Sequence, residues 1–174
     1  MTLVRDPEAL LPLVATGARI AVLAPTPVDL TPAETSSYLR IGLAEALRER
    51  GLEVDAFITP LDPTASDVAA IAAAVAGYAM AIVCTFDAVS FPGQVSLVSH
   101  LAGYGTSAGT GPAGAGRVVA VACRSPYDVA LFPAAVASIC TYGIQPPQID
   151  ALADALLGRI PFAGCLPVRL EPAR

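Results

Sequence analysis

Short runs of apolar residues recur along the chain and alternate with segments that carry helix signals. Nearly every position in these runs is apolar, rather than every second one, which is typical of strands buried on both faces of a parallel sheet. Strands separated by helices favour parallel pairing, because a parallel connection needs a long crossover. The predicted strands cover residues 19–24, 53–58, 80–85, 117–123 and 138–142, and residues 166–170 are a candidate edge strand, where proline is tolerated.

Helix signals fill the intervals between the predicted strands. Thr31-Pro32-Ala33-Glu34 is a capping box with proline at the first helical position, and it predicts a helix that continues to Gly51. Phe91-Pro92-Gly93-Gln94 opens another helix, which continues to Leu101. Two further helices are predicted over residues 66–76 and 148–157, and the glycine-rich stretch 103–116 is predicted to be a loop.

This alternation predicts the α/β class. We expect a three-layer α/β/α sandwich, in which a mostly parallel sheet of about five to six strands carries helices on both faces. No internal repeat and no linker interrupts the pattern, so residues 1–174 are interpreted as a single domain.

The apolar content raises the question of a membrane segment, because 55% of the residues are hydrophobic and only 14% are charged. Residues 68–86 are uncharged and long enough to span a bilayer, but they are mostly Ala and change from a helix pattern to a strand pattern at Gly77. The first thirteen residues contain Arg5, Asp6 and Glu8 and lack the apolar core of a signal peptide. We therefore expect a soluble protein with no membrane partner, and the cytoplasm is slightly favoured over other compartments.

Charge argues against a nucleic-acid partner. The net charge is −5, so the surface would repel a phosphate backbone. All ten basic residues are Arg, and the absence of Lys excludes a Schiff-base lysine and a phosphate-binding P-loop lysine.

Two stretches match the residue pattern of a catalytic or cofactor-binding motif but lack the strand and helix that each motif requires. Gly105–Gly109 fits the G-x-S-x-G nucleophile elbow, but that motif needs a strand before its serine and a helix after it. Gly109–Gly114 fits G-x-G-x-x-G, but a dinucleotide site needs this motif between the first strand and a helix. A small hydrolase built on Ser107 and the single histidine, His100, is the weakest of the functional hypotheses.

The four cysteines lack the paired spacing of a zinc site, so no metal is expected. Three of them fall in predicted strands, where cysteine usually behaves as a small buried side chain. Disulfides are not required by anything in the sequence, and they are not excluded. The cysteines are Cys84, Cys123, Cys140 and Cys165.

The candidate ligand-binding residues lie at the carboxyl ends of the predicted strands, where open α/β sheets bind their ligands. Asp87 follows one strand, and Arg124, Tyr127 and Asp128 follow another, with Gln94 expected at the same edge. The favoured alternative is that Asp87 and Asp128 cap the helices that follow them. No pair of carboxylates stands out as a catalytic dyad, so no catalytic residue is predicted.

Several segments, taken in order, resemble the C-terminal α/β domain of glycoside hydrolase family 3, in its β-N-acetylhexosaminidase branch. Together they span nearly the whole chain. They are Thr2–Asp6 with Leu10–Leu13, Gly93-Gln94, Val118–Ala122 leading into Ser125–Asp128, Tyr142, Ala151–Gly158, and Gly164–Val168.

The resemblance implies a glycosidase parent whose catalytic barrel lies outside this chain. In that branch the barrel carries an aspartate nucleophile and an Asp–His acid/base pair, in a loop with a lysine. This chain has no lysine and is too short for a barrel, so we expect it to be inactive alone and to need no cofactor.

The leading hypothesis is therefore an accessory domain of a β-N-acetylhexosaminidase-like enzyme, whose partner is the catalytic barrel. Carbohydrate and a second copy of the chain stay open as further partners. The alternative is a free-standing carbohydrate-binding or small-ligand-binding α/β module that uses the carboxyl edge of its sheet. An accessory domain would also explain part of the apolar composition, because a face that meets a barrel leaves an exposed apolar patch.

Overall fold

The computed structural model describes residues 1–14, 17–33, 35–103 and 117–170. Its centre is a six-stranded sheet with the order β1-β6-β5-β4-β2-β3. Five strands are parallel and β1 pairs antiparallel to β6, so the prediction of a mostly parallel α/β sandwich is confirmed. The strands are β1 (Thr2–Arg5), β2 (Ile20–Pro25), β3 (Val54–Thr59), β4 (Met80–Thr85), β5 (Val118–Ala122) and β6 (Ala137–Cys140).

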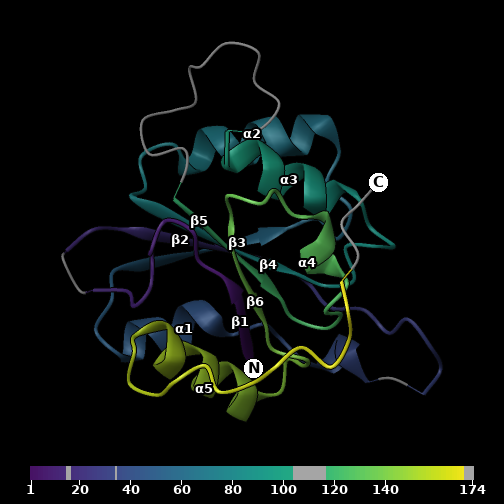
Figure 1. Ribbon diagram of the computed structural model, residues 1–174. Coiled ribbons are helices and arrows are strands. Elements are labelled where there is room, and N and C mark those ends of the chain that lie inside the picture. The colour runs from purple at the N-terminus through teal and green to yellow at the C-terminus, as the bar shows by residue number, and fades with distance from the viewer. Residues whose placement is uncertain (15–16, 34, 104–116, 171–174) are drawn as a thin grey trace.

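Helices cover both faces of the sheet, with α2 and α3 above it and α1 and α5 below it in Figure 1. Two separate apolar clusters fill the spaces between these layers, one on each face. The helices are α1 (Leu43–Glu49), α2 (Ala65–Val75), α3 (Gly93–Leu101), α4 (Asp128–Leu131) and α5 (Pro146–Leu156), with a short 3-10 helix over Ser36–Tyr38.

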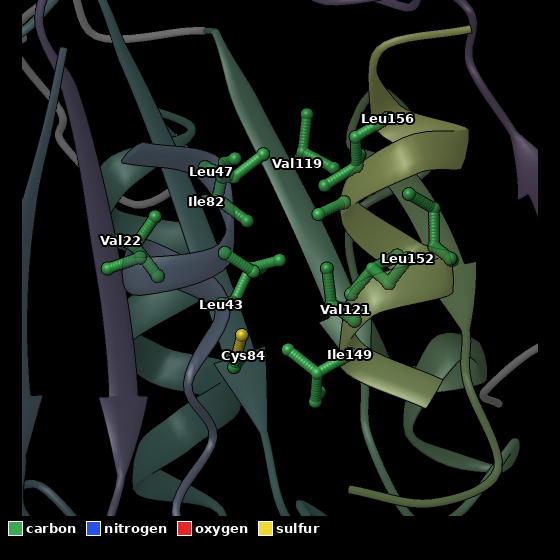
Figure 2. Close-up of a cluster of buried hydrophobic side chains, with 14 of the residues drawn as sticks. Val22, Leu43, Leu47, Ile82, Cys84, Val119, Val121, Ile149, Leu152 and Leu156 are labelled. Atoms are coloured by element: carbon green, nitrogen blue, oxygen red, sulfur yellow. The ribbon is translucent and has the colours of Figure 1, made fainter. Parts of the chain in front are cut away.

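The continuous apolar runs follow from burial on both faces. In β2, Val22 packs in the cluster beneath α1 and α5, whereas the next residue, Leu23, packs in the cluster beneath α2 and α3. Successive strand residues point to opposite faces, so both faces of such a strand favour apolar side chains. Figure 2 shows the first cluster, where Leu43 and Leu47 of α1 and Leu152 of α5 meet the sheet.

The prediction of a helix that starts at the Thr31 capping box is wrong. Residues 31–33 form a turn, and the first α-helix begins only at Leu43, after the N-cap residue Gly42. The Asp29 carboxylate accepts hydrogen bonds from the Ser37 backbone N–H at 2.8 Å and from the Ser37 hydroxyl at 2.7 Å, which holds this segment in a different conformation. Glu34, the last residue of the proposed box, lies outside the described residues.

The predicted edge strand over residues 166–170 is also wrong. That segment is not a strand, although Leu166 and Leu170 pack against the cluster beneath α2 and α3. The edge beside β6 is instead taken by β1, and the chain near Gly164 runs past it, with the Gly164 N–H donating to the Met1 carbonyl at 3.0 Å. Gly164 has to be glycine here, because a Cβ would lie 2.3 Å from that carbonyl oxygen.

Candidate functional site

The carboxyl ends of β4, β5 and β6 lie side by side at one edge of the sheet, because these strands are parallel neighbours. Asp87 follows β4, Arg124 follows β5, and Tyr142 follows β6. This carboxyl edge is where an open α/β sheet binds its ligands. Four of the five predicted site residues belong to one connected group here, and Tyr127 does not.

Gln94 fixes the turn that follows β4. Its side chain is buried, and its Oε1 accepts the backbone N–H of Phe86 at 2.7 Å. Its Nε2 donates to the carbonyl of Phe86 at 3.1 Å and to the carbonyl of Leu61 at 2.9 Å. Gln94 therefore joins the segments that follow β3 and β4, and its side-chain amide is hydrogen-bonded within the domain.

Asp128 holds the same turn from the other side. Its side chain is fully buried, and its carboxylate accepts the Thr85 hydroxyl at 2.7 Å and the Ala88 backbone N–H at 3.0 Å. Burial in an apolar environment penalises the charged form, and it raises the pKa of the Asp128 carboxyl above its usual range. Asp128, like Gln94, is thus hydrogen-bonded within the domain and holds the turn after β4.

The expectation that Asp87 and Asp128 cap helices is wrong. The N-cap residues of α3 and α4 are Pro92 and Tyr127, and neither helix has a side-chain cap hydrogen bond. The Asp128 carboxylate reaches across to the end of β4 instead, and the Asp87 carboxylate reaches toward Arg124.

Asp87 has a left-handed backbone, with φ of 61°. A non-glycine residue in this region is uncommon, and such residues are often found at functional sites. Its carboxylate lies 3.8 Å from the guanidinium of Arg124, which is about one-third exposed. The same guanidinium lies over the Phe86 ring, 5.8 Å from its centroid.

Tyr142 is a second left-handed residue at this edge, with φ of 64°. Its hydroxyl forms a 2.7 Å hydrogen bond with the hydroxyl of Thr2 in β1. The neighbouring Thr141 hydroxyl lies within hydrogen-bond distance of the carbonyls of Cys123 and Gly143, at 3.1 Å and 2.9 Å. The turn after β6 is therefore tied to the ends of β1 and β5.

A pocket of about 270 Å³ opens at these strand ends. We call it the carboxyl-edge pocket. Of the five residues predicted from the sequence, Arg124 lines this pocket, and the other residues of its wall were not predicted. That wall includes Ser36, Phe86, Tyr142, Gln145 and Gln148.

Tyr127 stands apart from the pocket. Its side chain is exposed, and its backbone N–H donates to the Ser125 hydroxyl at 3.3 Å. It belongs to a set of exposed large apolar or aromatic side chains at the carboxyl edge. The set comprises Tyr38 after β2, Ile58 near the end of β3, Val89 after β4 and Tyr127 after β5.

His100 lies far along α3 from the carboxyl edge. It borders a small pocket with Met80 and Arg117, which lie at the amino ends of β4 and β5. His100 therefore sits toward the opposite edge of the sheet from Asp87 and Asp128. The two glycine-rich motifs over residues 105–114, and Ser107 with them, lie outside the described residues, so the hydrolase hypothesis stays a prediction.

The cysteines are all free, and Cys84, Cys123 and Cys140 are buried, as expected of small core side chains. Burial raises the pKa of the Cys140 thiol to about 12, so this thiol stays protonated. Within the described residues, no three or more His, Cys, Asp or Glu side chains are grouped to hold a metal ion. No helix in the described part of the chain is both long and apolar enough to cross a bilayer.

Comparison with known proteins gives structural matches only. No protein-family model and no curated protein matches the sequence. A glycoside hydrolase family 3 β-N-acetylglucosaminidase from Paenibacillus sp. str. FPU-7 matches with a TM-score of 0.81 at 22% identity, over 99% of this chain and 31% of that one. A fungal multi-domain β-N-acetylglucosaminidase of the same family matches with a TM-score of 0.76 at 21% identity, over 99% of this chain and 18% of that one.

A β-glucosidase from Erythrobacter marinus is a weaker match, with a TM-score of 0.56 at 17% identity, over 91% of this chain and 27% of that one. The chain is thus an α/β sandwich with a parallel sheet and one antiparallel edge strand. More particularly, it has the fold of one part of the family 3 β-N-acetylglucosaminidases, and it spans less than a third of the length of the Paenibacillus enzyme. The resemblance found in the sequence is confirmed at the level of the fold.

Proposed function

We propose that this chain serves as the C-terminal α/β domain of a family 3 glycoside hydrolase of the β-N-acetylglucosaminidase type, and that it packs on a catalytic barrel. The observation that carries this proposal is the structural match over 99% of this chain, which takes up only 31% of the Paenibacillus enzyme. The remaining part of such an enzyme would supply the chemistry.

The carboxylates at the carboxyl edge support a non-catalytic role. A retaining glycosidase needs two carboxyl groups that both reach the scissile bond. In the described part of this edge, each aspartate already has a partner within the domain. Asp29 accepts from Ser37, Asp62 from the Gly93 N–H, Asp67 from the Thr64 N–H and Asp128 from Thr85, whereas Asp87 pairs with Arg124.

The exposed side chains at the same edge support docking of the barrel there. Tyr38 is 86% exposed and Ile58 is 78% exposed, and large apolar side chains this exposed often mark an interaction surface when they share one edge. A groove of about 440 Å³ lies beside Ile58, lined by Pro25, Pro27 and Phe57 among others. We therefore place the barrel contact over the ends of β2 and β3.

The first test is hydrolysis of 4-nitrophenyl N-acetyl-β-D-glucosaminide by the isolated chain. We expect no activity above that of buffer. Activity that disappears in Asp87→Asn or Asp128→Asn would overturn the proposal, because it would place catalysis within this chain.

The second test addresses docking. This chain replaces the matching region of the Paenibacillus enzyme, and hydrolysis by the chimera is compared with hydrolysis by an enzyme that lacks the region. We expect the chimera to be the more active, and we expect Tyr38→Asp with Ile58→Asp to remove that gain by placing charges in an apolar contact. Val14→Asp is the matched control, because Val14 is 72% exposed but borders a pocket at the amino ends of β2 and β4.

A free-standing ligand-binding module is the second candidate function, and the carboxyl-edge pocket favours it. Calorimetry with N-acetylglucosamine oligomers tests this candidate. Binding that weakens in Asp87→Ala but not in Tyr127→Ala would support it, because Asp87 orients a wall residue of the pocket and Tyr127 does not.

A further inference from the structure

Strand β3 lies at one end of the sheet, and among the described residues β2 is its one neighbouring strand. The Ile20 N–H donates to the Glu53 carbonyl at 2.9 Å, while Ile20 itself is paired with Val54. In this parallel pattern the odd-numbered residues of β3 bond to β2, and the even-numbered residues direct their N–H and C=O groups away from it. The outer edge of β3 is therefore formed by the backbones of Val54, Ala56 and Ile58.

Both ends of this outer edge are closed. The Arg48 guanidinium donates through its Nε to the Val54 carbonyl at 2.7 Å. Pro60, which directly follows β3, continues the alternation but has no N–H to donate. Ala56 and Ile58 lie between these two ends, and both residues are exposed. An exposed strand edge with open polar groups is a template for pairing with another strand.

The spacing of these open residues is self-complementary. Residues that face each other in an antiparallel pair can exchange both of their backbone hydrogen bonds. When Ala56 faces Ile58 of a second copy, Ile58 faces Ala56 of that copy, so the open groups of both residues are used. If Ala56 faced its own equivalent, Ile58 would meet the closed Val54. If Ile58 faced its own equivalent, Ala56 would meet Pro60.

The side chains also fit together in this register. Ile58, which is 78% exposed, lies opposite the small side chain of Ala56, and both residues line the groove of about 440 Å³. Phe57 lies on the two-fold axis and faces Phe57 of the second copy, and aromatic pairs across strands are stabilising. Asp55 faces the uncharged Thr59, so the carboxylates of the two copies are not placed opposite each other.

We propose that two copies of this chain pair antiparallel through β3, about a two-fold axis at Phe57, and form one sheet that continues across both copies. This dimer goes beyond the accessory-domain function and belongs to the chain without a barrel. Ile58 is also part of the surface that we assign to the barrel, so a barrel and a second copy exclude each other at this residue. The paired stretch is short, so we expect a weak and reversible dimer.

The test is sedimentation velocity of the whole chain over roughly 10 µM to 1 mM, the range in which a weak dimer exchanges with its monomer. We expect the sedimentation coefficient to rise with concentration. Ala56→Pro should weaken dimerisation by roughly tenfold or more, because it removes an N–H that points away from β2 and leaves the bonds to β2 intact. Tyr38→Asp is the matched control, because Tyr38 is 86% exposed and belongs to the barrel surface but not to β3. It should dimerise as the unaltered chain does.

Hydrogen exchange of the unaltered chain identifies the paired residues without relying on the folding of a variant. The amide protons of Ala56 and Ile58 should exchange more slowly as the concentration rises, because they become hydrogen-bonded only in the dimer. Those of Asp55 and Phe57 are bonded to β2 in each copy, so they should be protected at every concentration.

A second variant keeps every backbone N–H and changes one exposed side chain. Ile58→Lys should also weaken dimerisation by roughly tenfold or more, because it removes an apolar contact and places like charges on one face of the paired strands.

Four outcomes would each overturn the proposal. They are a chain that stays monomeric at roughly 1 mM, a dimer in which the exchange of Ala56 and Ile58 is unchanged, full dimerisation of Ala56→Pro, and loss of dimerisation in Tyr38→Asp. Hydrolysis by the chimera does not require a second copy, so the docking proposal stands or fails separately.

Discussion

At the scale of single residues, the left-handed backbone of Asp87 has a measurable cost. Glycine adopts φ near 61° without strain, whereas alanine does not. Both Asp87→Gly and Asp87→Ala remove the carboxylate that pairs with Arg124. We expect the alanine variant to be less stable than the glycine variant by about 1 kcal/mol. Urea unfolding of the two variants gives this difference, and equal stability would show that the turn relaxes.

Asp128 makes stability depend on pH. Its pKa in the fold is raised from the ordinary value of 3.8, so the folded chain holds this proton more tightly than the unfolded chain does. Its contribution to the free energy of unfolding is therefore greatest below pH 3.8, and it falls as the pH rises through the raised pKa.

Asp128→Asn provides the comparison, because an amide has no proton to lose in this range. The stability of the native chain relative to this variant should decline as the pH rises from 3.8, as measured by thermal unfolding over a series of buffers. A constant difference would mean that the carboxyl is not desolvated in solution.

The position of Asp87 and Arg124 at strand ends could be predicted from the sequence, because an apolar run that stops marks the end of a buried strand. The burial of individual side chains could not be predicted, since it depends on which strands become neighbours in the sheet. Asp128 is therefore buried under β4 while Arg124, four residues earlier, lines a pocket. The same reasoning could have placed Tyr142 at a strand end. The predicted strand over residues 138–142 instead included Tyr142, because its predicted end lay two residues beyond the end of β6 at Cys140.

At the scale of elements, helix α2 begins with a true capping box. The Thr64 hydroxyl accepts the Asp67 backbone N–H, and the Asp67 carboxylate accepts the Thr64 backbone N–H at 2.9 Å. We expect Thr64→Ala to lower the free energy of unfolding by about 1 kcal/mol. Thr31→Ala is the control from the box that forms no helix, and it should change stability by less than about 0.5 kcal/mol. Chemical denaturation measures both, and equal losses would contradict the assignment.

Strands with a continuous apolar run were predicted correctly, whereas a strand that forms only through its tertiary contacts was not predicted. The strands β2, β4 and β5 lie within a residue or two of their predicted ranges, because burial on both faces leaves a continuous apolar run. By contrast, β1 has four residues and ends in Arg5, so it shows no such run. Its strand conformation comes from pairing with β6, and this pairing cannot be predicted from the residues of β1 alone.

At the scale of the whole molecule, hydrogen bonds from Arg5 connect the edge strand β1 to α4 and to the segment between α4 and β6. Its guanidinium donates to the carbonyls of Val129, Phe132 and Val136 at 3.0–3.2 Å, and burial lowers its pKa. We expect Arg5→Met to destabilise the fold by roughly 2 kcal/mol, because these carbonyls lose a charged donor. Arg169→Met, at an exposed arginine, is the control for loss of one positive charge. Thermal unfolding measures the stability of both variants. Equal losses in Arg5→Met and Arg169→Met would contradict a structural role for the Arg5 hydrogen bonds.

The two buried clusters account for much of the apolar composition. A single sheet covered on both faces buries nearly every residue of its central strands, so a chain of this size can be 55% hydrophobic without any membrane segment. Only a few large apolar or aromatic side chains of the described residues stay exposed, and Tyr38 and Ile58 are the most exposed of them.

The pairing of β1 with β6 also sets an order of events during synthesis. Thr2 and Tyr142 meet although they are 140 positions apart in the chain, so β1 leaves the ribosome before the other strands of this sheet and can pair with β6 only after those strands have been translated. The core strands β2, β3 and β4 have their partners within a much shorter stretch of chain and can assemble first. Within this sheet, the first strand in the chain is thus among the last to be paired, and until then the emerging sheet has an open edge that a chaperone or another nascent chain could occupy.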